Sequence, residues 1–198
     1  MNRIRTAAVS AAVVAVTAAS FTPASAAPAP RFLSPGQLPA ASTPWTADSI
    51  RKGAPDERSW CTAKATPATG TRYRDFRTEL DTTARQTITV ASTEAKAAEL
   101  AAKLRRAVET CLHRMKAQDP GLKGKTIHHG RIAVEEGANV YSIDTSHPKA
   151  GANDIALFSV GRDGRAVTVV EWGQMGDLSG VPLAGFRLTT SRAVAKLY

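Results

Sequence analysis

The sequence predicts an α+β fold: a twisted antiparallel (mixed) sheet of about six strands, with a long amphipathic helix and a C-terminal helix packed on it, in the order ββαββββα. One long stretch repeats apolar residues at helical spacing, and six shorter runs are rich in residues typical of strands. The two kinds of segment do not alternate regularly. We therefore expect helices segregated on one face of the sheet rather than a parallel sheet.

The N-terminus has the pattern of a secretory signal peptide over residues 1–26. Arg3 and Arg5 precede an apolar Ala/Val run, and Ala24-Ser25-Ala26 supplies a small-residue cleavage site. The run is shorter than the roughly 20 apolar residues that a membrane helix needs. We expect a secreted, extracellular protein, cleaved after about Ala26 and without a transmembrane segment in its mature chain. A retained N-terminal anchor is the alternative.

Length and charge limit the possible classes of mature protein. Removing residues 1–26 from the 198-residue sequence leaves 172 residues, which suit one domain, expected at 47–198 after an extended Pro/Ala-rich leader at 27–46. The net charge falls from +9 to +7 when Arg3 and Arg5 are removed. Such an excess serves solubility or attracts anionic polymers and surfaces. Because the basic residues are dispersed, without interleaved aromatic residues, we expect no nucleic-acid partner, and we expect a monomer.

The first elements lead into the long helix. In the leader, Ser34-Pro35 predicts a short helical turn, which Phe32 and Leu38 can hold against the domain. Strands are expected at Thr71–Glu79 and at Arg85–Ser92, where Thr, Ile and Val favour β structure. The long helix is expected over Thr93–Gln118, with Thr93 capping its first amides. Its buried stripe comprises Ala97, Leu100, Ala101, Leu104, Ala107, Val108, Cys111, Leu112 and Met115.

Four more strands are expected after this helix. Lys125–Glu135 and Asn139–Thr145 are joined across a short glycine-containing turn. Ile155–Gly161 and Arg165–Trp172 form the clearest hairpin, because the Asp163-Gly164 pair between them is typical of a tight turn.

Two irregular loops and a helix complete the chain. Ser146–Asn153 and Gly173–Gly180 are polar or glycine-rich and flank the hairpin. If the hairpin pairs tightly, both loops emerge at the same end and form one rim, where we expect any ligand to bind. Apolar residues at helical spacing from Leu183 to Leu197 predict the closing helix.

Cys61 and Cys111 are the two cysteines of the sequence, and we expect them to pair because an exported chain matures in an oxidising compartment. The bridge would fasten the long helix to the start of the domain. It closes a loop of about 50 residues, worth roughly 3–4 kcal/mol on the chain-entropy model. Neither cysteine has a second ligand at a spacing typical of metal sites, so we expect no metal.

These features resemble a known family. Five features carry the resemblance: the Leu33-Ser34-Pro35-Gly36-Gln37-Leu38-Pro39 opening, Trp60-Cys61 before the first strands, Cys111 on the long helix, the Asp163-Gly164 hairpin and the short closing helix. In these features the sequence is similar to the extracellular sensor domain of mycobacterial PknH-type receptor Ser/Thr kinases, and to related secreted or lipid-anchored actinobacterial proteins. The resemblance implies an antiparallel sheet with helices around a cleft for an unidentified ligand, and no reaction. This chain has two cysteines where the kinase sensor has two disulfides, and no kinase domain, so we expect no signalling through a tethered kinase.

Catalytic patterns are weak in this sequence. His128-His129 is the only pair suited to acid–base or metal chemistry, yet neighbouring strand residues point to opposite faces. No Gly-x-Ser-x-Gly motif marks a nucleophilic serine. We expect no cofactor and no enzyme activity, and a hydrolase using His128 or His129 is one alternative.

Candidate ligand walls are aromatic: Trp45, Trp60, Tyr141 and Trp172. The leading hypothesis is a secreted, non-catalytic ligand-binding or sensor-like module of the cell envelope or extracellular space, with an unknown small-molecule or cell-wall ligand. The second alternative is a basic adhesin for anionic cell-wall polymers.

Overall fold

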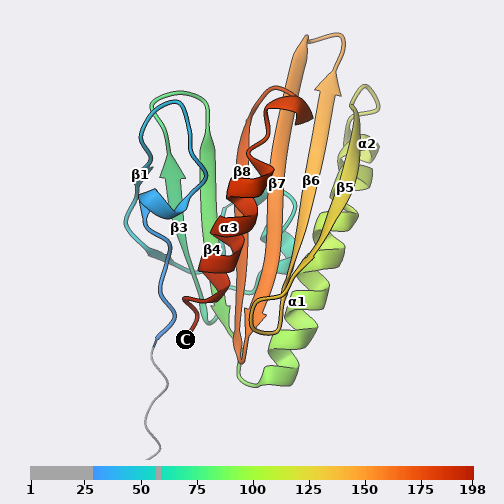
Figure 1. Cartoon of the computed structure of the whole chain (residues 1–198). Helices are drawn as coiled ribbons and strands as arrows, with labels where there is room; N and C mark the ends of the chain where they lie inside the picture. Colours follow the sequence, from blue (N-terminus) through green and yellow to red (C-terminus); the bar gives the residue numbers. More distant parts are fainter. Residues whose placement is uncertain (1–28, 57–58) are drawn as a thin grey trace, which may run out of the picture.

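The computed structural model describes residues 29–56 and 59–198, so the predicted signal peptide lies outside the described residues. Its centre is one antiparallel sheet of eight strands with three α-helices packed on it (Figure 1), which confirms the predicted fold class. The strands are β1 (Thr46–Ala47), β2 (Arg51–Lys52), β3 (Thr71–Arg77), β4 (Thr83–Val90), β5 (Lys123–Ile132), β6 (Ala138–His147), β7 (Ala152–Asp163) and β8 (Ala166–Met175). The helices are α1 (Glu94–Glu109), α2 (Cys111–Gln118) and α3 (Leu183–Val194), with short 3-10 turns η1 (Pro35–Gln37), η3 (Ala63–Ala65) and η4 (Leu178–Gly180).

The sheet order is β1-β3-β4-β8-β7-β6-β5, with β2 also pairing with β3. Strands β5 to β8 form a meander. β8 also pairs with β4, and this pairing joins the meander to the β3–β4 hairpin. The six predicted strands correspond to β3–β8. The two-residue strands β1 and β2 are too short to leave a pattern in the sequence, which explains why they were not predicted.

The two loops predicted beside the β7–β8 hairpin are largely strand. β6 continues to His147 and β7 begins at Ala152, so Ser146–Asn153 contains only a short turn. β8 likewise continues to Met175, and η4 takes up the end of Gly173–Gly180. Polar and glycine residues misled the prediction here because backbone pairing with the neighbouring strand, rather than side-chain type, decides where these strands end.

The long helix is confirmed, with one break. The Thr93 hydroxyl accepts a hydrogen bond from the Lys96 amide at 3.1 Å, as its predicted capping role requires. Thr110 then has φ −94° and ψ 1°, and this residue separates α1 from α2. Its hydroxyl donates back to the Arg106 carbonyl oxygen, a local bond that competes with regular helix geometry.

The helices cover both faces of the sheet, not one face as predicted. α1 and α2 pack on the face that carries Tyr141, Phe158 and Val169. α3 packs on the other face, against Leu157 and Trp172, and lies in front of the sheet in Figure 1. Alternate residues of the central strands therefore enter two separate cores, which is why these strands are apolar at most positions rather than alternating.

The leader contributes to the second core. η1 is the helical turn predicted after Ser34, and Phe32, Leu33 and Leu38 are buried. The Leu33 amide donates to Gln86 Oε1 at 2.7 Å, so a buried glutamine of β4 holds this segment against the sheet. Among the described residues, no helix has the length and apolar character needed to cross a bilayer.

Candidate functional site

The four predicted aromatic residues do not lie together. Trp45 and Trp172 belong to the core on the α3 face, whereas Tyr141 belongs to the core beneath α1. Trp60 is 46% exposed, while Tyr141 and Trp172 are 1% and 3% exposed. Only Trp60 therefore offers a largely accessible aromatic surface.

The buried members of this set have internal roles. The Trp45 indole donates to the Pro39 carbonyl oxygen at 2.7 Å, and Trp172 packs in the core with its indole nitrogen bonded to no described residue. The Tyr141 hydroxyl donates to Glu109 Oε1 at 2.9 Å. Burial is the larger cause and this bond to Glu109 the next, and together they raise the pKa of the Tyr141 phenol.

The two neighbouring histidines lie on opposite faces of β5. His128 stacks on Tyr141 with ring centroids 4.7 Å apart, whereas His129 Nε2 lies 2.8 Å from the Ser142 hydroxyl. Burial, with Arg187 and His128 nearby, lowers the pKa of His129. The serine–histidine pair resembles the start of a catalytic dyad, but Ser142 has no exposed surface for a substrate to reach. The described residues also contain no cluster of three or more His, Cys, Asp or Glu side chains that could hold a metal ion.

The predicted disulfide is present between Cys61 and Cys111. It joins residues 59–65, which contain η3, to the start of α2. Arg114 strengthens this junction, because its guanidinium donates to the Cys61 carbonyl oxygen at 3.1 Å and to the Ala107 carbonyl oxygen at 2.9 Å. Residues 59–65 are thus held as a fixed wall beside the helices.

A polar network holds the same wall to the sheet, and nothing in the sequence indicated it. Glu171 of β8 accepts hydrogen bonds from the Ser59 hydroxyl at 2.8 Å and from the Thr62 hydroxyl at 2.5 Å. Burial raises the pKa of the Glu171 carboxyl, although these two bonds and the charge of Arg85 act in the opposite direction.

Arg85 extends this network across β4 and β3. It is 5% exposed and pairs with Asp75 at 2.5 Å and with Asp56 at 2.9 Å. It also donates to the Ser59 hydroxyl at 3.0 Å. Burial lowers the pKa of the Arg85 guanidinium, but the two carboxylates outweigh that effect and raise it overall. The network is therefore a buried polar support under the wall.

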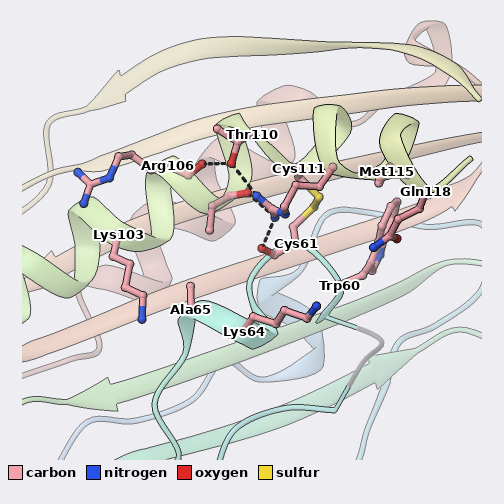
Figure 2. A pocket seen from close by; sticks show the side chains of 12 residues that line it. Trp60, Cys61, Lys64, Ala65, Lys103, Arg106, Thr110, Cys111, Met115 and Gln118 are labelled. Atoms are coloured by element: carbon pink, nitrogen blue, oxygen red, sulfur yellow. Dashed lines mark hydrogen bonds between the residues drawn. A yellow bond between two sulfur atoms is a disulfide. The ribbon is translucent and has the colours of Figure 1, made fainter. Parts of the chain in front are cut away.

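A groove of about 400 Å³ lies between this wall and the α1–α2 helices (Figure 2); we call it the cationic groove. Among the described residues that line it, four are basic, namely Lys64, Lys103, Arg106 and Arg114, and none is acidic. None of the four forms an ion pair with a described residue.

The arrangement of these side chains leaves a positive rim over an apolar floor. In Figure 2, Lys64 and Lys103 extend from opposite walls, and Arg106 points away from Trp60. The floor between them contains the disulfide, Ala65 and Met115. This geometry suits a ligand with negative charge and an apolar or ring-shaped part.

A second groove of about 340 Å³ lies beyond Trp60, which lines both grooves together with Met115. Asp81 and Asp154 line it, no basic residue in the described part of the chain does so, and we call it the acidic groove. Its other walls include residues 154–156 and 173–175, the two ends of the β7–β8 hairpin. Residues 173–175 belong to one of the two loops expected to form a ligand-binding rim, residues 154–156 directly follow the other loop, and Asp154 pairs in register with Met175. Trp172, predicted from the sequence as a ligand wall, instead faces the opposite core.

Comparison with known proteins adds no assignment. No family model, no curated protein and no solved structure matches the chain. The similarity to PknH-type sensor domains therefore stays a prediction from the sequence.

Proposed function

We propose that this protein is a secreted, non-catalytic binding module, and that it takes an anionic ligand in the cationic groove. The observation that carries the proposal is the set of four basic side chains around one apolar-floored groove, which no carboxylate of the described residues lines. Unpaired cations on a concave surface concentrate anions locally. The wall is also fixed from two sides, by the disulfide and by the Glu171 network, so little order has to be gained when a ligand binds.

The export signal and the paired cysteines support a place outside the cytoplasm, because disulfides persist mainly in oxidising compartments. His128 and His129 lie on opposite faces of β5, and Ser142 is fully buried. Both observations favour binding over hydrolysis by His128 or His129.

Lys64 and Lys103 provide the test, since both are exposed and neither holds the fold together. The probe is 8-anilinonaphthalene-1-sulfonate, which combines a sulfonate with aromatic rings. We expect Lys64→Gln/Lys103→Gln to weaken its binding about fivefold to tenfold in a fluorescence titration. The matched control is Lys52→Gln/Lys149→Gln, which removes the same charge from exposed positions outside the groove. Equal weakening by both double variants would refute a groove-centred site.

A basic adhesin for anionic cell-wall polymers is the second candidate, favoured by the +9 charge of the whole sequence. A pull-down on purified cell wall separates the two. Dispersed attraction predicts that both lysine double variants lose retention equally and that salt releases the wild type, because exposed charges are screened over about 10 Å at 0.1 M salt. Selective loss in Lys64→Gln/Lys103→Gln supports the groove.

A further inference from the structure

The cationic and acidic grooves meet at one exposed indole. Trp60 and Met115 line both, so the two grooves adjoin at these side chains. Lys64, Lys103, Arg106 and Arg114 lie on one side of Trp60, and Asp81 and Asp154 lie on the other. The two grooves thus form a single surface whose charge changes sign at an aromatic ring.

The acids of the second groove are accessible. Asp81 and Asp154 are both exposed, and neither forms an ion pair with a described residue. Asp81 accepts a hydrogen bond from the Met175 amide at 3.2 Å, which fixes its carboxylate at the end of β8. Carboxylates only accept hydrogen bonds, so this groove selects ammonium or hydroxyl groups.

From this charge pattern we infer that the two grooves are one site for an extended acidic glycan that also carries amino groups. The glycan's carboxylates lie among the basic residues, a sugar ring packs on Trp60, and its ammonium groups lie at Asp81 and Asp154. The inference rests on the proposed function, since it keeps the anionic end of the ligand in the cationic groove.

The structure favours a glycan over a peptide of similar charge. Extended peptides commonly bind by adding a strand to a free sheet edge. The edges of this sheet are β1, β2 and β5, and of these no residue lines either groove. Instead, helix and loop side chains line the cationic groove, strand residues line most of the acidic groove, and the flat indole of Trp60 lies between them. The apolar C–H face of a sugar ring complements such a surface, while its hydroxyls reach the flanking charges.

Two matched probes test the inference. One is a hyaluronan hexasaccharide, in which carboxylates alternate with N-acetyl groups. The other is the same hexasaccharide after N-deacetylation, in which carboxylates alternate with ammonium groups. We expect calorimetry to show that the wild type binds the deacetylated form about threefold to tenfold more tightly.

Substitutions then test which groove binds which charged groups of the glycan. Asp81→Asn/Asp154→Asn should remove the preference for the deacetylated form, because it weakens binding of that form more than binding of the acetylated form; the asparagine side chain still offers an oxygen that can accept from the Met175 amide. The matched control, Glu94→Gln/Glu135→Gln, removes two exposed carboxylates outside both grooves and should keep the preference. Trp60→Ala should weaken both forms by a similar factor, because the ring contact is common to them.

The outcomes separate this inference from the proposed function. Equal binding of the two hexasaccharides by the wild type would overturn the inference, while a continued effect of Lys64→Gln/Lys103→Gln would leave the anion site standing. Loss of preference in both carboxylate double variants would equally overturn it, since general charge would then explain the result. Tighter binding of a Glu–Lys hexapeptide than of the deacetylated glycan would reassign the site to peptides, and absence of binding by either glycan would also refute it.

Discussion

The Ser59 hydroxyl donates a hydrogen bond to Glu171 Oε2 at 2.8 Å, although 112 residues separate the two in sequence. Ser59 immediately precedes Trp60 and begins the wall of both grooves, whereas Glu171 lies on β8 in the centre of the sheet. Through this contact the sheet holds Trp60 in place, the only largely exposed tryptophan among the described residues. The position of Trp60 in the proposed site therefore depends on the Glu171 carboxyl, which lines neither groove.

Stability should depend on pH through Glu171. Its folded-state pKa is raised above the ordinary value of 4.5, mainly by burial. The folded protein then binds the proton more tightly than the unfolded chain, so the stability gained is complete below the unfolded pKa and is lost as pH rises through the folded pKa. Glu171→Gln cannot titrate. We expect the unfolding free energy of the wild type, minus that of Glu171→Gln, to fall as the pH rises above about 4.5 in denaturant titrations.

Glu79→Gln, which removes an exposed carboxylate outside the network, controls for general charge effects in the same pH series. A wild-type minus Glu171→Gln difference that stays constant with pH would show that Glu171 titrates alike in the folded and unfolded states.

Local signals in the sequence were enough to predict the helix, the hairpin and the disulfide. Thr93 caps its helix from three residues away, and Asp163-Gly164 turns a hairpin between adjacent strands. Cys61 and Cys111 needed only the inferred compartment for their pairing to be predicted. The helix cap and the hairpin turn depend on residues close in sequence. The cysteine pairing follows from the oxidising compartment alone and needs no knowledge of the fold.

The candidate site depends instead on distant pairs. Glu171 sits among apolar strand residues and Arg85 among Ala, Gln and Thr residues, and a charged side chain in either setting normally lies in solvent. Both faces of this sheet are covered, so these charges point inward and find several of their partners in residues that precede β3 and lie outside the strands. Trp60 could not be ranked above Trp45 and Trp172 from sequence, because its exposure follows from this long-range network.

Removing the disulfide should reduce stability and loosen the cationic groove. Cys61→Ser/Cys111→Ser opens a loop with a sequence separation of 50, which should cost about 3–4 kcal/mol on the chain-entropy model. Thermal unfolding should show the loss, and 8-anilinonaphthalene-1-sulfonate should bind more weakly because residues 59–65 lose their link to α2. Thiol titration of the native and the denatured, unreduced wild type should find no free thiol. Two free thiols per chain would contradict the pairing.

Gly161 allows α3 to pack closely on β7. A Cβ atom there would lie 2.4 Å from Val194 Cγ2 and 2.9 Å from the Ala138 side chain. Gly161→Ala should therefore destabilise the protein by about 1–3 kcal/mol through overpacking. Gly36→Ala, in η1, is the control, because a Cβ atom added there would have no neighbour within 4 Å. Equal unfolding free energies for the two variants, measured in denaturant, would argue against this packing of α3.

Trp60 should dominate the response of tryptophan fluorescence to solvent. It is 46% exposed, whereas Trp172 is 3% exposed and Trp45 is partly buried with its indole bonded to Pro39. We expect Trp60→Phe to lose most of the acrylamide quenching and to shift the remaining emission to shorter wavelength. Its unfolding free energy should change by no more than about 0.5 kcal/mol, as is usual for exposed positions. Trp45→Phe should keep the quenching, and quenching that persists in Trp60→Phe would mean that the indole between the two grooves is covered and unable to receive a ligand.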